Sequence, residues 1–291
     1  MILLKMNRIL ILAIMTLGSS LFVHAGDGWP QPKGFGYFKL SQYWVIADSH
    51  YTNTGQVDPN ATRGTFVTSI YGEYGFTERL TGIVYFPFFV RALQYEQVSG
   101  TTGDVIQEGD AINSVGDTQL TLKYGLVQND KIAISGSFSL GLPFGTNNGG
   151  RDGSLQTGTG EWNQMIRLDI SKSFRIGKTY PFASLYTAYN NRTNGFSDEF
   201  RYGGKVGLAV DKFSMILNIN AVNSTKNGDP NFNSEGTGLY SNNAEYIGIT
   251  PEIGFKVTDN WGITASYGTA TNGKLIFANP AYSVGIFFTP K

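Results

Sequence analysis

The stretch from Ser114 to Pro143 constrains the fold of this chain more than any other, because its apolar residues recur at every second position. Residues 118–126 carry Leu, Tyr and one Thr on one parity, and Gln, Thr, Lys and Gly on the other. After a turn at residues 128–131, residues 132–142 repeat this alternation. Successive side chains of a strand point to opposite faces, so the stretch predicts a hairpin with one apolar wall and one polar wall.

Two architectures use such a hairpin. In a soluble β-sandwich the apolar wall faces a core, whereas in a membrane barrel it faces lipid and the polar wall lines the interior. The connections favour the barrel, because tight turns and longer loops alternate along the chain, as in membrane barrels. The tight turns follow Phe76, Val127, Phe174, Val210 and Val257. Strands are predicted at about residues 34–46, 65–76, 81–91, 118–126, 132–142, 165–170, 180–189, 201–210, 214–219, 247–255, 261–267 and 282–288.

An even number of strands is typical of bacterial outer-membrane barrels and returns both termini to one side of the membrane. We therefore predict an all-β fold, a twelve-stranded antiparallel transmembrane β-barrel with short periplasmic turns and longer extracellular loops. Aromatic residues beside the tight turns support this prediction, because membrane barrels carry aromatic girdles at the two interfaces. These residues are Phe76, Phe174, Tyr180, Phe213, Phe255 and Trp261.

The N-terminal residues predict export from the cytoplasm. Lys5 and Arg8 precede the apolar run 9–17, and Val23-His24-Ala25 provides a small-residue cleavage site, which is the order of parts in a secretory signal peptide. We predict a signal peptide at 1–25, a periplasmic tail at 26–33 and the barrel at 34–291, located in a Gram-negative type outer membrane.

Composition excludes some function classes. The chain has 22 basic and 22 acidic residues, so no large surface of one sign indicates a nucleic-acid partner. It has no cysteine, which suits a barrel that satisfies its backbone hydrogen bonds by closure instead of disulfides. Its 37 glycines and 36 Tyr and Phe residues recur along the predicted strands instead of gathering in one cluster. We expect outer-membrane lipid, a small organic solute and the barrel-assembly machinery as partners, and the pattern leaves the oligomeric state open.

Residues 115–124 (VGDTQLTLKY) and 137–143 (SFSLGLP) carry a resemblance to a known family. This segment is similar to outer-membrane proteins associated with the phenol meta-cleavage degradation pathway, a group of transporters. The resemblance implies a barrel that carries small organic, including aromatic, compounds across the outer membrane. It brings no site residues with it.

The residues on the parity opposite the apolar wall are the candidates for a pore lining. They include five basic and four acidic residues, and they form no ring of like charge, so we predict a narrow, weakly charge-selective passage or an interior closed by ion pairs. Trp29, in the short tail, is a candidate for a plug at the periplasmic mouth. The predicted pore-lining residues are Lys39, Glu73, Asp117, Lys123, Arg167, Asp169, Arg201, Lys205 and Glu252.

Two other function classes stay open. An enzyme barrel of the lipase or protease type would need a nucleophile and a base, and the one histidine outside the signal peptide is His50, which follows Asp48 and Ser49. Neighbours on an extended segment point in alternate directions, so this run is not itself a triad. The third class is a structural or adhesion barrel that acts through loops near 92–113, 143–160 and 223–243. We predict a passive transporter that is not an enzyme and that has no cofactor and no metal.

Overall fold

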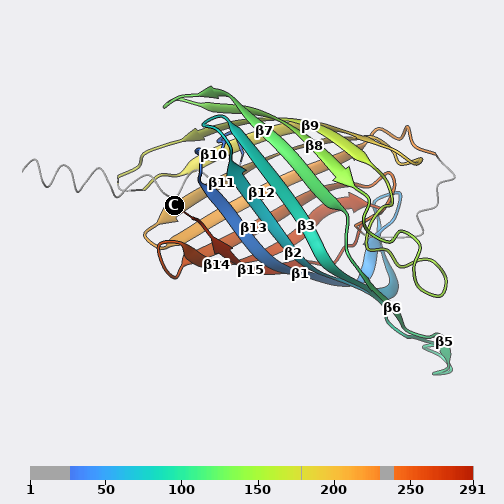
Figure 1. Cartoon of the computed structure of the whole chain (residues 1–291). Coiled ribbons are helices and arrows are strands. Elements are labelled where there is room, and N and C mark those ends of the chain that lie inside the picture. Colours follow the sequence, from blue (N-terminus) through green and yellow to red (C-terminus); the bar gives the residue numbers. More distant parts are fainter. Residues whose placement is uncertain (1–26, 178, 230–238, 291) are drawn as a thin grey trace, which may run out of the picture.

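The computed structural model describes residues 27–177, 179–229 and 239–290, and the predicted signal peptide lies outside these ranges. The described residues form an antiparallel β-barrel, drawn in Figure 1. The strands of its wall are β1 Gly36–Tyr51, β2 Val57–Gly75, β3 Leu80–Gln94, β7 Thr118–Gln128, β8 Ala133–Leu142, β9 Asn163–Ser173, β10 Phe182–Arg192, β11 Glu199–Val210, β12 Phe213–Ser224, β13 Glu245–Lys256, β14 Trp261–Lys274 and β15 Ala281–Phe288.

Each wall strand pairs with its neighbours in the sequence, and the barrel closes where the last strand pairs with the first. At this closure Phe38 of β1 lies opposite Phe288 of β15, and the register runs to Val45 opposite Ala281. Closure gives each of the twelve described wall strands a neighbour on both sides, so the backbone hydrogen bonds of the wall are made within the sheet. The twelve strands of the wall are those predicted from the two-residue period of the sequence.

The two faces of the wall differ in chemistry. Large apolar side chains stand on the outside, as Ile166 (68% exposed) and Leu185 (62%) do. The buried residues instead include small and polar side chains that face inward, such as Ala133, Ser135 and Ser171. A soluble protein does not expose apolar side chains along every strand, whereas a barrel in lipid does. The fold is therefore that of a transmembrane β-barrel. No helix among the described residues is both long enough and apolar enough to cross a membrane.

The tight turns lie at one end of the barrel and the longer loops at the other, and the C-terminus lies at the tight-turn end (Figure 1). Aromatic rings gather near the tight turns, where Phe213 and Phe255 have ring centroids 4.8 Å apart. Trp261 and Phe288 are 4.6 Å apart. These contacts lie where the sequence predicts an interfacial girdle.

Strand β3 departs from a regular ladder, as its proline predicts. The β2 register moves from Thr68 opposite Phe89 to Ile70 opposite Phe86, which makes a bulge around Pro87. On its other side β3 pairs with β7 only from Leu80 to Tyr85. Beyond this point β3 pairs with the short strand β6, Asp110–Ser114.

Several strands reach further toward the loop end than the alternation predicts. Strand β1 continues to Tyr51, and β2 already begins at Val57, so residues 57–64, which lie between two predicted strands, belong to a strand. The predicted loop after β3 also holds a small hairpin of β4, Gln97–Val98, and β5, Val105–Gln107. This hairpin projects from the loop end of the barrel (Figure 1). Above the lipid belt neither face is apolar, so alternation no longer marks the strand.

Candidate lumenal site

The tail, residues 27–33, lies across the interior of the barrel at the tight-turn end. The backbone N–H of Gly28 donates to Ser171 Oγ on β9 over 2.9 Å, and the N–H of Gln31 donates to Thr81 Oγ1 on β3 over 2.8 Å. Gln128 Nε2 on β7 donates to the Gly28 carbonyl over 2.9 Å. Because β3 and β9 lie on opposite sides of the β7–β8 hairpin, the tail bridges strands that do not touch each other.

Two glycines permit this close approach. A Cβ on Gly75 of β2 would lie 2.1 Å from the Pro32 carbonyl oxygen and 2.5 Å from that of Gln31. A Cβ on Gly28 would lie 2.6 Å from the Ala133 carbonyl oxygen. All three contacts are with backbone atoms, so no rotamer change relieves them. The seated tail therefore depends on the absence of a side chain at both positions.

Asp27 anchors the beginning of the tail between two basic residues of the wall. Its carboxylate lies 3.1 Å from Lys205 Nζ on β11 and 3.8 Å from Arg167 Nη2 on β9. Asp169 holds Arg167 from the other side, with Arg167 Nη2 2.6 Å from Asp169 Oδ1. The Arg167 guanidinium also lies 3.8 Å from the ring centroid of Tyr186. The guanidinium is thus fixed by a carboxylate and a ring, and its Nη2 lies between Asp169 and Asp27 of the tail.

Glu73 of β2 meets the other half of the tail. It is 2% exposed, accepts a hydrogen bond from Gln31 Nε2 over 3.0 Å and accepts another from the Tyr71 hydroxyl. Lys123, on β7, is 5% exposed and lies in register with Thr81 of β3, the residue that holds Gln31. The middle of the tail is therefore set among buried polar groups of β2, β3 and β7.

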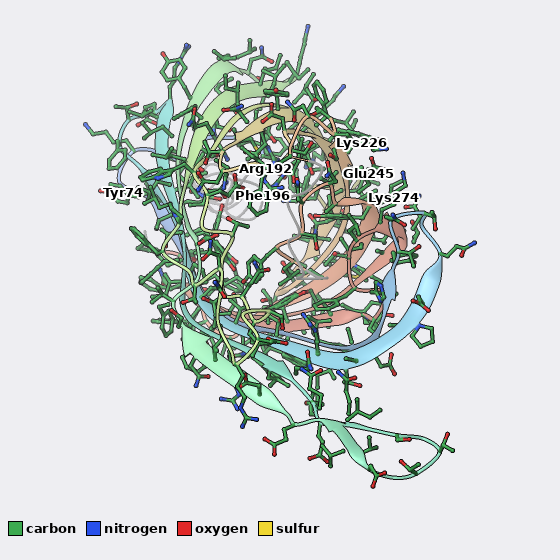
Figure 2. All side chains as sticks on the ribbon, turned by 90° about the vertical axis from the view of Figure 1, so that its right-hand side faces the viewer. Tyr74, Arg192, Phe196, Lys226, Glu245 and Lys274 are labelled. Carbon is green, nitrogen blue, oxygen red and sulfur yellow. The ribbon has the colours of Figure 1, made fainter. Side chains whose placement is uncertain are left out.

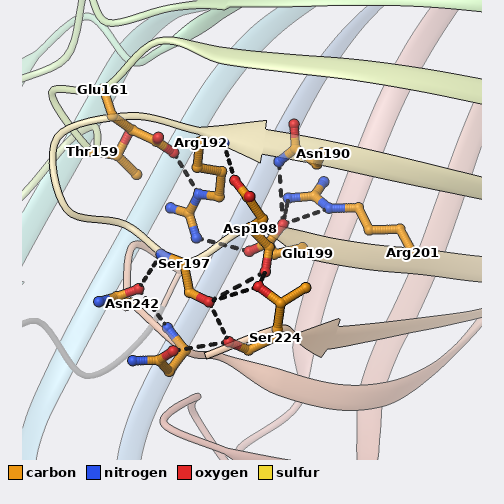
Figure 3. Close-up of polar contacts among 12 residues, drawn as sticks. Thr159, Glu161, Asn190, Arg192, Ser197, Asp198, Glu199, Arg201, Ser224 and Asn242 are labelled. Atoms are coloured by element: carbon orange, nitrogen blue, oxygen red, sulfur yellow. Dashed lines mark hydrogen bonds and ion pairs between the residues drawn. The ribbon is translucent and has the colours of Figure 1, made fainter. Parts of the chain in front are cut away.

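A second polar cluster occupies the loop end, shown in Figure 3. Arg192 of β10 donates to Glu161 over 2.6 Å and to Glu199 over 2.8 Å. Glu199 of β11 also accepts from Arg201, over 2.6 Å for its Nη2, and from Asn190 over 3.2 Å. The side chains of Arg192 and Glu199 are 5% exposed. The charges alternate and are fully paired, so this cluster stiffens the wall of β9, β10 and β11.

Asp198 ties two loops together beside this cluster. Its carboxylate accepts hydrogen bonds from the Arg192 backbone N–H over 2.8 Å and from Asn227 Nδ2 over 2.8 Å. Tyr189 adds a further donor at 2.7 Å. Burial acts to raise the pKa of Asp198, but the hydrogen bonds from Arg192 and Asn227 outweigh it and hold the pKa below its usual range. The carboxylate thus stays charged and joins the β10–β11 loop to residues after β12.

Asp117 is the one predicted pore-lining residue that lies outside a strand. It precedes β7. Its carboxylate accepts hydrogen bonds from the Gly145 N–H over 3.0 Å and from the Thr159 N–H over 2.6 Å. It therefore closes the loop between β8 and β9 at its two ends. The interior also holds an ion pair across the closure of the barrel, with Lys39 Nζ 2.9 Å from Glu252 Oε2.

A cavity of about 490 Å³ lies in the loop-end half of the interior. Figure 2 looks into this end, where Arg192 and Phe196 point inward and Lys226, Glu245 and Lys274 stand at the rim. The cavity lining combines aromatic and charged groups, including those of the paired cluster. Its lining includes Tyr43, Asp117, Glu161, Asn190, Arg192, Glu199, Arg201, Tyr240 and Tyr246.

The structure places the predicted pore-lining residues, except Asp117, on the inner parity of the wall. It brings Arg167, Asp169 and Lys205 together around the tail, and it sets Lys39 against Glu252. Passage of a solute past them stays a prediction. Sequence reasoning missed Asp27 in the tail and four interior residues that lie just beyond the ends of predicted strands. These four are Glu161, Asn190, Arg192 and Glu199.

His50 lies near the loop end of β1, opposite Asp58 of β2 in register. The Ser49 hydroxyl beside it is engaged by the Asp48 carboxylate over 2.9 Å and by Asn279 Oδ1 over 3.1 Å. These contacts fasten the end of β1 to the β14–β15 loop. That the chain is not an enzyme stays a prediction.

Comparison with known proteins bears on the fold. No family model matches the chain, and no curated protein matches it. Among solved structures it is similar to the COG4313 outer membrane channel from Pseudomonas putida F1, with 17% identity, a TM-score of 0.57, and coverage of 92% of this chain and 100% of that one. It is also similar to the NanC porin, with 7% identity, a TM-score of 0.51, and coverage of 86% and 98%. The likeness of the structures supports the barrel fold. At identities this low it does not identify the solute, which has to be argued from the residues of this chain.

Proposed function

We propose that this chain is an outer-membrane channel that passes small, weakly charged or aromatic organic solutes by passive diffusion. The observation that carries the proposal is the cavity of about 490 Å³ inside a closed lipid-facing barrel, because a solute-sized interior space open to one end has no role in a purely structural wall. The tight turns face the periplasm and the loops face outward, as in other outer-membrane barrels.

The interior chemistry supports a weakly charged solute. Several carboxylates and basic groups of the wall are paired with each other, as Lys39 is with Glu252 and Arg201 is with Glu199. An interior with balanced charge selects weakly between cations and anions. The tyrosines of the cavity lining and the resemblance of residues 115–124 to proteins of the phenol meta-cleavage pathway favour aromatic solutes.

In this proposal the tail narrows the periplasmic mouth. Its hydrogen bonds to Ser171 and Thr81 place it across the interior, and Trp29 contacts Phe182 of β10 at a centroid distance of 6.1 Å. A twelve-stranded barrel lies between eight strands, whose interior is filled, and sixteen, which leave an aqueous channel. A short segment is therefore enough to restrict the passage.

The test is single-channel recording of the refolded mature chain in planar bilayers under a salt gradient. We expect a small conductance that stays mostly at one low level, with a reversal potential near zero. Catechol in the bath should interrupt this current more often than cyclohexane-1,2-diol, which offers the same two hydroxyl groups without an aromatic ring. A correctly folded barrel without any conductance contradicts the proposal, and equal interruption by the two diols contradicts its aromatic part.

A second candidate function is binding of a surface partner through the β4–β5 hairpin. Val98 (55% exposed), Val105 (52%) and Ile106 (69%) stand in the open on this projecting hairpin. Two short strands alone are marginally stable in water. Replacing residues 97–107 by a short glycine linker separates the two functions, since it should leave conductance unchanged and abolish attachment only if the hairpin is an adhesion site.

A further inference from the structure

The beginning of the tail presents two groups to the wall, and together they have the chemistry of an aromatic carboxylate. Asp27 places its carboxylate against Lys205 and Arg167. Two residues later, Trp29 sets its indole edge-on to the Phe182 ring at an interplanar angle of 82°. The wall therefore receives a negative charge and an aromatic ring from one short segment.

The wall residues that receive these groups are held in place by other contacts. Arg167 is fixed by Asp169 and stacked on Tyr186, while Lys205 and Phe182 are positions on neighbouring paired strands, β11 and β10. The basic side chains keep part of their surface open, 27% for Arg167 and 28% for Lys205, whereas Asp27 is 9% exposed. The receiving surface is thus built without the tail and borders the interior of the barrel.

Charge balance shows what the surface lacks when Asp27 leaves. Arg167 and Lys205 carry two positive charges and Asp169 carries one negative charge, so Asp27 completes a neutral set. Toward β2 and β7 the interior holds the buried Glu73 and Lys123, one of each sign. Without the tail the surface has one unbalanced positive charge in a partly buried place, which favours a monoanion.

Asp27 itself sits in a strained conformation. Its φ is 59°, in the left-handed region that few residues other than glycine adopt. The Ser135 hydroxyl donates to its carbonyl over 3.1 Å and helps to hold it there. Strain of this kind lowers the cost of releasing the segment once another carboxylate takes its place.

We propose that Arg167, Lys205 and Phe182 form a binding site for small aromatic monocarboxylates, and that Asp27 and Trp29 occupy this site when no such solute is present. The proposal deepens the proposed channel function by naming a solute class and the point at which it meets the tail. A bound solute displaces the tail by competition, so the compound that enters also clears its own passage.

The test measures binding of benzoate to the refolded full barrel by isothermal titration calorimetry. Asp27→Asn keeps the size of the side chain and removes the competing charge, so benzoate should bind roughly fivefold to tenfold more tightly than to the unaltered chain. Lys205→Met in the Asp27→Asn background should weaken binding by about tenfold or more, and Lys205→Arg should restore it. Lys226→Met, an exposed lysine at the rim of the opposite end of the barrel, is the matched control and should change nothing.

Benzamide and cyclohexanecarboxylate separate the two halves of the ligand. Benzamide keeps the ring without the charge and should bind at least about tenfold more weakly than benzoate. Cyclohexanecarboxylate keeps the charge without the aromatic ring and should bind more weakly than benzoate in the Asp27→Asn protein. Equal affinity of the unaltered chain and Asp27→Asn for benzoate overturns the proposal, as does equal binding of benzamide.

Failure of the binding-site proposal can be told apart from failure of the channel function. Benzoate binding that follows the Asp27 and Lys205 pattern in a barrel without conductance supports the site and contradicts the channel. Conductance with no benzoate binding to Asp27→Asn supports the channel and contradicts the site.

Discussion

Gly75→Ala is the single substitution that should most directly free the tail. The new Cβ would lie 2.1 Å from the Pro32 carbonyl oxygen, so the tail must move by about 1.3 Å to reach an ordinary contact of about 3.4 Å. The hydrogen bonds of Gln31 to Thr81 and to Glu73 begin at 2.8 and 3.0 Å, and neither survives a displacement of that size.

Losing these two hydrogen bonds weakens the seated tail by about 2 kcal/mol, at roughly 1 kcal/mol net for each. The ratio of seated to released tail should therefore fall by about thirtyfold. Ala is compatible with the strand conformation of β2, so the wall itself should keep its stability.

The assay is the fraction of time that single channels of the variant spend at their higher conductance level, compared with the unaltered chain. Gly136→Ala is the matched control, because a Cβ there meets only the Leu126 side chain at 3.6 Å on the lipid face. Heat-dependent mobility on electrophoresis verifies that both variants fold. A folded Gly75→Ala barrel with the same conductance levels and dwell times as the control refutes the reasoning.

Three further predictions follow from the interior and the loops. Glu199→Gln removes the carboxylate that pairs with Arg201 and one of the two that pair with the buried Arg192. It should therefore lower the free energy of unfolding by about 3 kcal/mol, measured by urea titration in lipid vesicles, and shift the reversal potential toward anion selectivity. The pKa of Asp198 is lowered in the folded protein, so its loop tie should be complete above the unfolded pKa of about 3.9 and lost as the pH falls through the lower folded value. Amide exchange at Thr225, compared with Asp198→Asn at each pH, should show protection at pH 6 that is lost only at a pH below the unfolded pKa of about 3.9. His50→Ala should leave conductance unchanged, and any esterase or protease activity that disappears with it would favour the enzyme alternative.

The strands within the lipid belt could be predicted because lipid imposes a strict alternation on them. Leu120, Leu122 and Tyr124 stand outward while Lys123 between them is buried, and a shift by one residue would exchange the two faces. Pro87 is a local signal of the same kind, because a proline cannot donate to the ladder and is found in a strand at bulges or edges, and β3 has its bulge there. These signals are local in sequence, so no knowledge of the closed barrel was needed.

The interior contacts could not be predicted in the same way. Glu199 lies on the inner parity of β11, opposite the exposed Phe200 and Tyr202, so alternation places it inside the barrel but does not show that it pairs with Arg192 of β10. Asp27 meets Lys205 across a separation in sequence that only barrel closure brings together. The seating of the tail also depends on the missing side chain of Gly75, a tertiary requirement that a glycine in a strand pattern does not disclose by itself.

The measurement that tests the account most directly is the conductance of a barrel whose tail is shortened. A refolded chain without residues 27–31 loses the hydrogen bonds that seat the tail on Ser171, Thr81 and Glu73. It should stay at the higher conductance level, whereas the chain with the full tail should stay mostly at the lower one. Identical conductance levels for the two barrels, both shown to be folded by heat-dependent mobility, would contradict the claim that the tail controls passage through this barrel.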